Sequence, residues 1–168
     1  MELVLFREPH AQAMELYTAA FPEWERRTAE RHLHTLNNIN FLPFHIVEDG
    51  EFIGLLYCWQ WDELIFAEHL ATTPQWRGGG FGGKAIEELK ALFPKSVIIL
   101  EIEPPTTEIA ARRETFYLRH GFLSNPYEHI HPSYSKPHKP HPLVVMSYPV
   151  AISPELFTRF RQLSFSVL

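Results

Sequence analysis

Apolar residues recur along this chain at two spacings, and the change from one spacing to the other predicts a mixed α/β architecture. Short apolar or alternating runs predict strands at 2–6, 41–47, 52–61, 64–71, 97–103, 127–130 and 143–148. Apolar residues at three- and four-residue intervals predict helices: one with Met14, Tyr17 and Phe21 on one face, then 23–36, 84–93, 106–120 and a last helix from residue 153.

Local signals mark where several of these elements begin and end. Asp49-Gly50 separates two predicted strands, and this dipeptide supplies the positive φ angles that a tight hairpin requires. Gly121 is suited to end the fourth helix as a left-handed C-cap, and Ser153 is suited to begin the last helix as its N-cap. No internal repeat or Gly/Ser linker interrupts the chain, so we expect a single domain over residues 1–168.

Composition limits the classes of function. The chain has 168 residues, of which 45% are hydrophobic and 21% charged, as expected for one soluble globular domain. A net charge of −5 provides no broad basic field, so no nucleic-acid partner is expected. No apolar run approaches the roughly 20 residues of a membrane span, no signal peptide is indicated, and the single cysteine, Cys58, suits a reducing compartment. These features predict a cytoplasmic protein without a membrane partner.

Glycines are concentrated at 78–83, between a predicted strand and a predicted helix. Free N–H groups and the helix dipole favour an anion at such a position, and glycine lets the backbone approach phosphate oxygens closely. Five glycines would be a poor choice for a simple connection, because each one costs conformational entropy on folding. The segment therefore predicts a phosphate-binding loop.

Two familiar nucleotide-binding patterns fit this loop incompletely. The dinucleotide spacing G-x-G-x-x-G begins at Gly78, and Glu101 lies at a suitable distance for a ribose partner. However, a polar stretch precedes the first glycine, and only one βαβ unit is visible where a doubly wound domain needs several. The P-loop spacing also begins at Gly78 and ends at Lys84, but Ala85 follows where Ser or Thr would bind magnesium.

A third pattern, Q-x-x-G-x-G, is formed by Gln75, Gly78 and Gly80. Together with the upstream run LATTP at 70–74 and the downstream run FYLRHGF at 116–122, it resembles the GNAT superfamily of N-acetyltransferases. The resemblance implies an α/β (α+β) fold with a mixed, strongly twisted central sheet of six to seven strands flanked by helices. It also implies acetyl-CoA as co-substrate, in a V-shaped gap where the strand before the glycine loop splays from the next one.

The resemblance covers roughly residues 64–122 and implies a set of cofactor contacts. The pantetheine arm would pair with the backbone of the splayed strand, and the pyrophosphate would lie on the amides of the glycine loop. The sequence departs from the common family pattern at Ala110 and Arg113, where many members have Asn and Ala. The implied cofactor-binding residues are Leu70, Thr72, Gln75, Arg77, Gly78, Gly79, Gly80, Gly82, Gly83, Lys84 and Arg113.

Acetyl transfer to an amine needs a base for the ammonium proton, a donor to the developing oxyanion and an acid for the leaving thiolate. The resemblance implies the N–H of Leu70 as the donor and Tyr117 as the acid. Glu68 is the predicted base, because partial burial of its carboxylate would raise its pKa. His69, on the opposite face of the strand by alternation, is the reserve base.

Two residues are candidates for binding the acceptor, which is expected to be the primary amine of a small molecule. Glu103 ends a predicted strand beside the splay and could bind an ammonium, although a salt bridge to Arg112 or Arg113 would also explain it. Trp24 belongs to a segment that would border the acceptor.

Two alternatives to an enzyme stay open: a catalytically silent acyl-CoA sensor and a metal-binding protein. Four histidines in the His/Pro-rich stretch 129–142 could form a metal site, but no Cys or Asp joins them, so no metal is expected. This stretch is instead expected to border the acceptor pocket. The four histidines are His129, His131, His138 and His141.

The aromatic-rich tail at 165–168 is a candidate contact for a homodimer.

Overall fold

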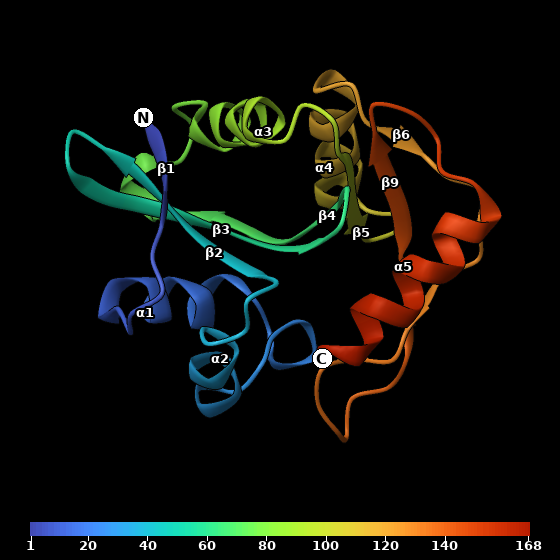
Figure 1. Cartoon of the computed structure of the whole chain (residues 1–168), viewed down its shortest axis with the longest axis horizontal. Helices are drawn as coiled ribbons and strands as arrows, with labels where there is room; N and C mark the ends of the chain where they lie inside the picture. The colour runs from blue at the N-terminus through green and yellow to red at the C-terminus, as the bar shows by residue number, and fades with distance from the viewer.

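The computed structural model describes all 168 residues and contains a seven-stranded sheet with helices on both faces (Figure 1). The strands of this sheet are β1 (Glu2–Leu5), β2 (Phe41–Glu48), β3 (Glu51–Trp61), β4 (Leu64–Thr72), β5 (Val97–Ile102), β6 (Leu123–Ser124) and β9 (Val144–Tyr148). A separate ribbon pairs β7 (Ile130–His131) with β8 (His141–Pro142). The helices are α1 (Ala11–Ala20), α2 (Ala29–Thr35), α3 (Phe81–Leu92), α4 (Glu108–Arg119) and α5 (Pro154–Ser166), with 3-10 turns η1 (Glu23–Glu25) and η2 (Pro74–Trp76). The predicted α/β fold is confirmed.

The order of strands in the sheet is β1-β2-β3-β4-β5-β9-β6. All neighbours are antiparallel except β4 and β5, which are parallel and are connected through α3. A parallel pair requires such a crossover, since a hairpin joins only antiparallel strands. The central parallel pair is therefore the place where the sheet changes its pairing mode.

Two apolar cores lie on opposite faces of the sheet. Tyr17 of α1 and Phe160 of α5 belong to one core, and Ile86 of α3 belongs to the other. Adjacent residues of β3 contribute to different cores, with Leu55 in the first and Leu56 in the second, because side chains alternate along a strand. Figure 1 shows α1 and α2 on the side of the sheet opposite to α3.

The predicted turn and cap residues are confirmed. Asp49 and Gly50 have φ angles of 50° and 79°, as a tight β2–β3 hairpin requires. Gly121 has a φ of 84° directly after the end of α4, and the Ser153 hydroxyl accepts a hydrogen bond from the amide of Leu156 at 3.1 Å.

The single helix predicted at 23–36 is wrong, because the chain divides it into η1 and α2. Thr28 is the N-cap of α2 and accepts a hydrogen bond from the amide of Arg31 at 3.3 Å. The intervening Arg26 is extended, with φ −142° and ψ 160°. The break turns the side chain of Arg27 into the protein, where it is buried.

Two further boundaries differ from the sequence prediction. The helix expected from residue 84 begins three residues earlier, at Phe81, so Gly82 and Gly83 belong to its first turn. The strand expected at 127–130 does not form as such: only its last residue, Ile130, is in a strand, the two-residue β7. Alternation alone could not identify this short pairing, because it depends on a partner strand that is distant in the sequence.

Strand β4 contains a β-bulge at Glu68. Cys58 of β3 lies opposite Ala67, and the preceding Tyr57 lies opposite His69, so Glu68 has no partner across the ladder. A bulge interrupts the alternation of side chains along a strand. The expectation that Glu68 and His69 point to opposite faces is therefore wrong, and His69 Nδ1 lies 3.6 Å from Glu68 Oε2.

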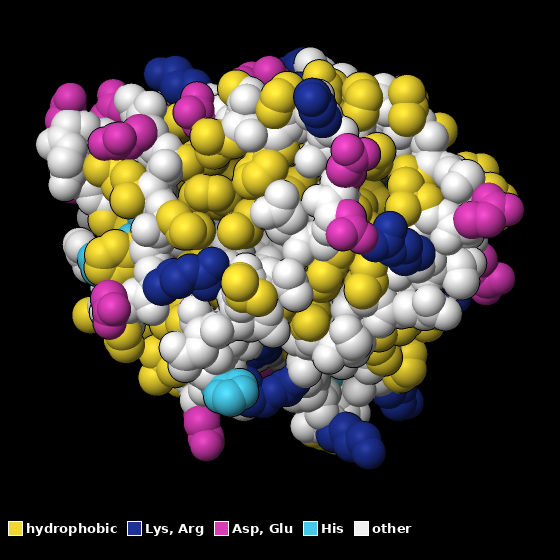
Figure 2. Space-filling view, in the orientation of Figure 1, with side chains coloured by type: hydrophobic (Ala, Val, Ile, Leu, Met, Phe, Trp, Pro, Cys, Tyr) yellow, Lys and Arg dark blue, Asp and Glu magenta, His cyan; other side chains and the backbone are white.

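Charged side chains of both signs are interspersed over the face in Figure 2, with apolar side chains between them. No helix is both long enough and apolar enough to cross a membrane.

Candidate active site

Strands β4 and β5 separate after three residue pairs and leave an opening in the centre of the sheet. The pairs are Leu64–Val97, Ile65–Ile98 and Phe66–Ile99, so the edge of residues 67–72 that faces β5 has no strand partner. A cavity of about 510 Å³ lies in this opening, and it is lined by Leu70 and Thr72 among other residues. The unpaired backbone can therefore bind a ligand that is extended alongside β4.

The glycine loop leads from η2 into the N-terminus of α3. Gly78 and Gly80 have φ angles of 82° and 76°, and a Cβ atom at either position would meet nothing within 4 Å. Gly80 is the N-cap of α3 and provides no side-chain cap, so the first amides of the helix are available to an anion. These two glycines are explained by backbone conformation, and the space in front of them is open.

The other glycines of the cluster have different neighbours. A Cβ on Gly83 would lie 2.8 Å from Nε2 of His120, the C-cap of α4, whereas a Cβ on Gly82 would lie 3.8 Å from the Phe116 ring. A Cβ on Gly79 would lie 2.8 Å from the Phe81 ring. Gly83 is thus required by the close packing of α3 on α4, which sequence reasoning had attributed to phosphate approach alone.

The polar residues around the glycine loop lie at the surface. Gln75 is exposed, and the Nε of Arg77 donates a hydrogen bond to the carbonyl of Thr72 at 3.3 Å. The ammonium of Lys84 lies 4.7 Å from the centre of the Phe81 ring. Arg77 also lines the cavity, so this loop provides positive charge at the cavity mouth.

Tyr117 and Arg113 bring α4 to the cavity. Both residues line it, one helical turn apart. Burial raises the pKa of Tyr117 to about 12, so its hydroxyl is protonated at neutral pH. Neither Arg113 nor Arg112 forms the predicted alternative salt bridge to Glu103, and Arg112 instead pairs with Glu108 at 2.6 Å.

Glu68 is a buried, fully bonded carboxylate, and the prediction that its pKa is raised is wrong. It accepts four hydrogen bonds: two from Arg27, at 2.9 and 3.0 Å, one from Trp59 at 2.8 Å and one from the Tyr134 hydroxyl at 2.7 Å. Burial acts to raise its pKa, but the Arg27 charge and the hydrogen bonds prevail and lower it to about 2. A carboxylate has about four lone-pair sites, so Glu68 has none free for a substrate proton.

His69 has one bonded and one unbonded ring nitrogen. Its Nε2 lies 2.7 Å from the carbonyl of Glu25, and since a carbonyl only accepts, Nε2 carries the hydrogen. Burial lowers the pKa of His69, against the opposing effect of Glu68, and its Nδ1 is buried without a hydrogen-bond partner.

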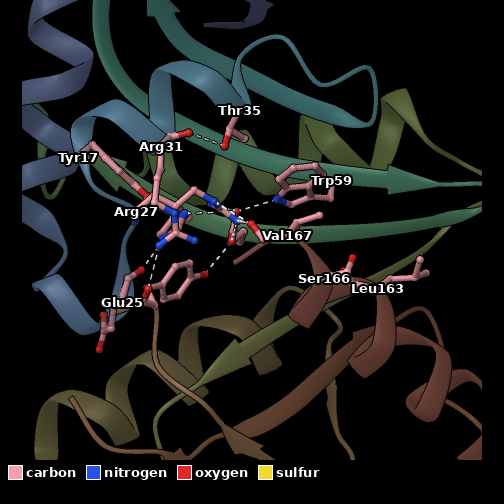
Figure 3. A network of polar contacts seen from close by, with 12 residues as sticks. Tyr17, Glu25, Arg27, Arg31, Thr35, Trp59, Leu163, Ser166 and Val167 are labelled. Atoms are coloured by element: carbon pink, nitrogen blue, oxygen red, sulfur yellow. Dashed lines mark hydrogen bonds and ion pairs between the residues drawn. The ribbon is translucent and has the colours of Figure 1, made fainter. Parts of the chain in front are cut away.

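The sequence placed Arg27 and Tyr134 in segments expected to border the acceptor, but it did not indicate that both contact Glu68. Arg27 also donates to the carbonyl of Val167 through Nε at 3.0 Å and Nη2 at 2.6 Å, and its amide donates to the Tyr17 hydroxyl at 2.9 Å (Figure 3). No local pattern identifies these residues, since the contacts join segments separated by up to 140 positions.

The wall of the cavity also carries two carboxylates that form no salt bridge. Glu25 of η1 and Glu103, which follows β5, both line it, together with His131 and His141. Burial raises the pKa of Glu25 and the neighbouring Glu103 raises it further, against the opposing effects of Arg113 and His141. Such an unpaired pair suits a cationic ligand.

Trp24 does not line this cavity. It is 42% exposed, and its ring lies 5.2 Å from that of His138 at the surface.

The four histidines considered as a metal site do not surround a common point. His129 Nε2 bonds to Glu101, whereas His131 Nδ1 accepts from the amide of Ser133 at 3.0 Å. No group of three potential ligands is arranged to hold a metal ion.

Comparison with known proteins agrees with this geometry. The family model "Acetyltransferase (GNAT) family" matches residues 10–122. A putative GNAT-family acetyltransferase from Bacteroides thetaiotaomicron is 32% identical with a TM-score of 0.83, over 90% of this chain and 86% of that one. No curated protein matches the sequence significantly.

Two more distant structures share the fold. The ribosomal-protein-S18-alanine N-acetyltransferase from Escherichia coli is 17% identical, with a TM-score of 0.57 over 84% of this chain and 87% of that one. An aminoglycoside 6'-N-acetyltransferase complexed with coenzyme A is 14% identical, with a TM-score of 0.64 over 92% of this chain and 99% of that one. The family model, the similarity to the Bacteroides protein and the splayed central sheet together place this chain in the GNAT acetyltransferase family, whose members are acyltransferases.

Proposed function

We propose that this protein is an acetyl-CoA-dependent N-acetyltransferase that acetylates the primary amine of a small molecule by direct attack. The observation that carries the proposal is the cavity between β4 and β5, which is lined by Arg77 next to the glycine loop, by Tyr117, and by the carboxylates of Glu25 and Glu103. Acetyl-CoA would supply the activated acyl group, and the amine would enter from the carboxylate side.

The residues around the opening fit the parts of acetyl-CoA. The unpaired edge at Leu70 and Thr72 would bind the pantetheine arm, and the first amides of α3 would bind the pyrophosphate. Gly78 and Gly80 leave open space where a side chain would obstruct the phosphates. The residues proposed around them are Gln75, Arg77, Gly79, Gly82, Lys84 and Arg113, with Gly83 acting through helix packing.

The chemistry would be divided between the two halves of the cavity. The Leu70 amide would donate to the thioester oxygen as the amine nitrogen attacks the carbonyl carbon, and Tyr117 would donate to the leaving sulfur. In the acceptor half, Glu103 would bind the ammonium and Glu25, whose pKa is raised, would receive its proton. Glu68 is not proposed as the base, because all its acceptor sites are occupied.

Calorimetry with acetyl-CoA tests the cofactor half. We expect micromolar binding by the unmodified protein and its loss in Gly80→Glu, since the new side chain would fill the space in front of the α3 amides. Gly50→Glu is a matched control: Gly50 has a φ of 79°, close to the 76° of Gly80, and also has nothing within 4 Å of a built Cβ, but it lies in the β2–β3 turn.

Absence of acetyl-CoA binding, or equal loss in both glycine variants, would contradict the proposed cofactor site. Release of free CoA thiol in the presence of primary amines tests the transfer step. Binding without thiol release for any amine would favour the silent sensor over the enzyme.

A further inference from the structure

Tyr134 is held at each of its polar groups by a different element. Its amide donates to the carbonyl of Trp24 at 3.2 Å, and its carbonyl accepts from Nη1 of Arg31 at 3.0 Å. Its hydroxyl donates to Glu68 Oε1 at 2.7 Å. The loop 131–141 is thereby joined at one residue to η1, α2 and β4.

Glu68 is the common acceptor at the centre of these contacts. Its carboxylate also binds Trp59 of β3 and the guanidinium of Arg27, which binds the carbonyl of Val167 at the end of α5 (Figure 3). The side chains of Arg27 and Glu68 are each only 1% exposed. Hydrogen bonds to a charged acceptor in such a water-poor setting are short and strong, so this cluster is a stiff junction.

The same junction forms one wall of the acceptor half of the cavity. Tyr134, His131 and His141 line the cavity that Glu25 and Glu103 also line. The ring of His131 stacks on that of Tyr134 at 5.1 Å and lies 5.4 Å from that of His141. Movement of Tyr134 would therefore displace both imidazoles from the acceptor half.

We infer that Glu68 and Tyr134 are positioning residues that fix loop 131–141 as the wall of the acceptor half, so that the amine depends on them and acetyl-CoA does not. The inference rests on the proposed function for the identity of the two ligands. It gives Glu68 a role that does not require proton transfer. It also explains why a buried carboxylate stands at the bulge of β4, where it contacts the loop on one side and Arg27 on the other.

Tyr134→Phe removes one of the four hydrogen bonds to Glu68 and keeps the ring. Tyr127→Phe is the matched control, because the Tyr127 hydroxyl also bonds to a single acceptor, the carbonyl of Ile152 at 2.6 Å, but outside the cavity. Arg31→Ala is a second variant that frees the loop from α2 without touching Glu68, should the first variant be poorly folded.

Hydrogen exchange directly measures how often the hydrogen bonds of the loop open. The amides of Ser133, Tyr134, His138 and Leu143 donate hydrogen bonds in or beside the loop. We expect their exchange to accelerate about tenfold in Tyr134→Phe and in Arg31→Ala, with exchange in α3 unchanged. Tyr127→Phe should leave the loop amides unchanged.

Ligand measurements then separate positioning from general destabilisation. We expect the Kd of acetyl-CoA in Tyr134→Phe to stay within about twofold of the unmodified protein, while the KM of the best acceptor in a panel of primary amines rises about tenfold. The panel consists of a diamine, an arylethylamine, an α-amino acid and a peptide with a free N-terminus.

Unchanged loop exchange in both variants would overturn the inference, as would an unchanged amine KM or an equal loss of acetyl-CoA affinity. Failure of the unmodified protein to bind acetyl-CoA would instead defeat the proposed function, and the exchange comparison alone would then decide whether Glu68 and Tyr134 hold the loop.

Discussion

The chemical character of a single side chain depends here on the groups that surround it. Glu68, whose side chain is buried, and Glu25, which is half-buried, line the same cavity, but their pKa values move in opposite directions. Glu68 has the charge of Arg27 and two further donors, Trp59 and Tyr134, around it, whereas the strongest charged neighbour of Glu25 is a second carboxylate, Glu103. Burial disfavours charge in both cases, and the sign of the neighbouring charge decides the outcome.

At the same scale, Tyr117 should be required for turnover and dispensable for binding. In Tyr117→Phe we expect kcat to fall about 100-fold with the Kd of acetyl-CoA nearly unchanged, because only the proton donor to the leaving sulfur is lost. Stopped-flow measurement of thiol release checks this.

Tyr148→Phe is the comparison for that experiment, since Tyr148 lies on β9 and does not line the cavity. An unchanged kcat in Tyr117→Phe would remove this residue from the proposed mechanism.

At the scale of elements, α3 serves two purposes with neighbouring glycines. Its N-cap, Gly80, and the preceding Gly78 adopt positive φ angles that open the loop, whereas Gly83 allows α3 to lie close to α4. A glycine-rich sequence therefore combines two physical requirements, one of conformation and one of packing. Only the space around each Cβ distinguishes them.

Alanine substitutions in the first turn of α3 should separate these requirements. Gly82→Ala should stabilise the protein by up to about 1 kcal/mol, because alanine favours a helix and its Cβ would have an ordinary 3.8 Å contact with Phe116. Gly83→Ala should lose that gain, because its Cβ would displace the ring of His120, which bonds to Glu87 at 2.7 Å.

Thermal unfolding of the two variants measures the difference. Equal stabilisation by both alanines would contradict the packing explanation for Gly83.

At the scale of the whole molecule, buried titratable groups distributed over the fold determine its response to acid. Burial lowers the pKa values of His32 and His45 to about 4, and Glu68 is lowered to about 2 by its partners. Each of these groups binds protons more readily in the unfolded chain than in the folded one. Stability therefore rises with pH across the interval between the unfolded and folded pKa of each group.

We predict a continuous loss of stability on acidification. Protonation of the two histidines should destabilise the folded protein as the pH falls from 6.5 to about 4. Protonation of Glu68 should do so as the pH falls from 4.5 to about 2. Each buried histidine contributes roughly 1.4 kcal/mol per pH unit within its interval. His45→Phe keeps a ring against Phe6 and Phe52. It should reduce the slope of the unfolding free energy against pH above pH 4 and leave the slope below pH 4 unchanged.

Urea unfolding at a series of pH values provides the measurement, and His34→Phe at an exposed position of α2 is the control. If the slope of the unfolding free energy against pH above pH 4 is equal in both variants, His45 does not contribute to the loss of stability in acid.

Most of the fold could be predicted, because it depends on signals between near neighbours in the chain. The β2–β3 hairpin follows from the conformation of Asp49 and Gly50, and the periodicity of apolar residues located β3, β4, α4 and α5. The predicted helix at 23–36 failed because Thr28 caps a new helix and Arg27 turns inward to partners outside the segment. Helical periodicity does not report such a competing contact.

The sequence by itself determined the family, the glycine loop and the position of Tyr117, because each is a compact motif whose chemistry is carried by adjacent residues. The tertiary structure alone decided that Glu68 is a bonded anion, that Glu25 lies near Glu103 and that Tyr134 bonds to Glu68. Glu68 is separated from Arg27 by 41 positions and from Tyr134 by 66. Charge state and orientation are set by groups within a few ångströms in space, and only folding brings such distant residues together.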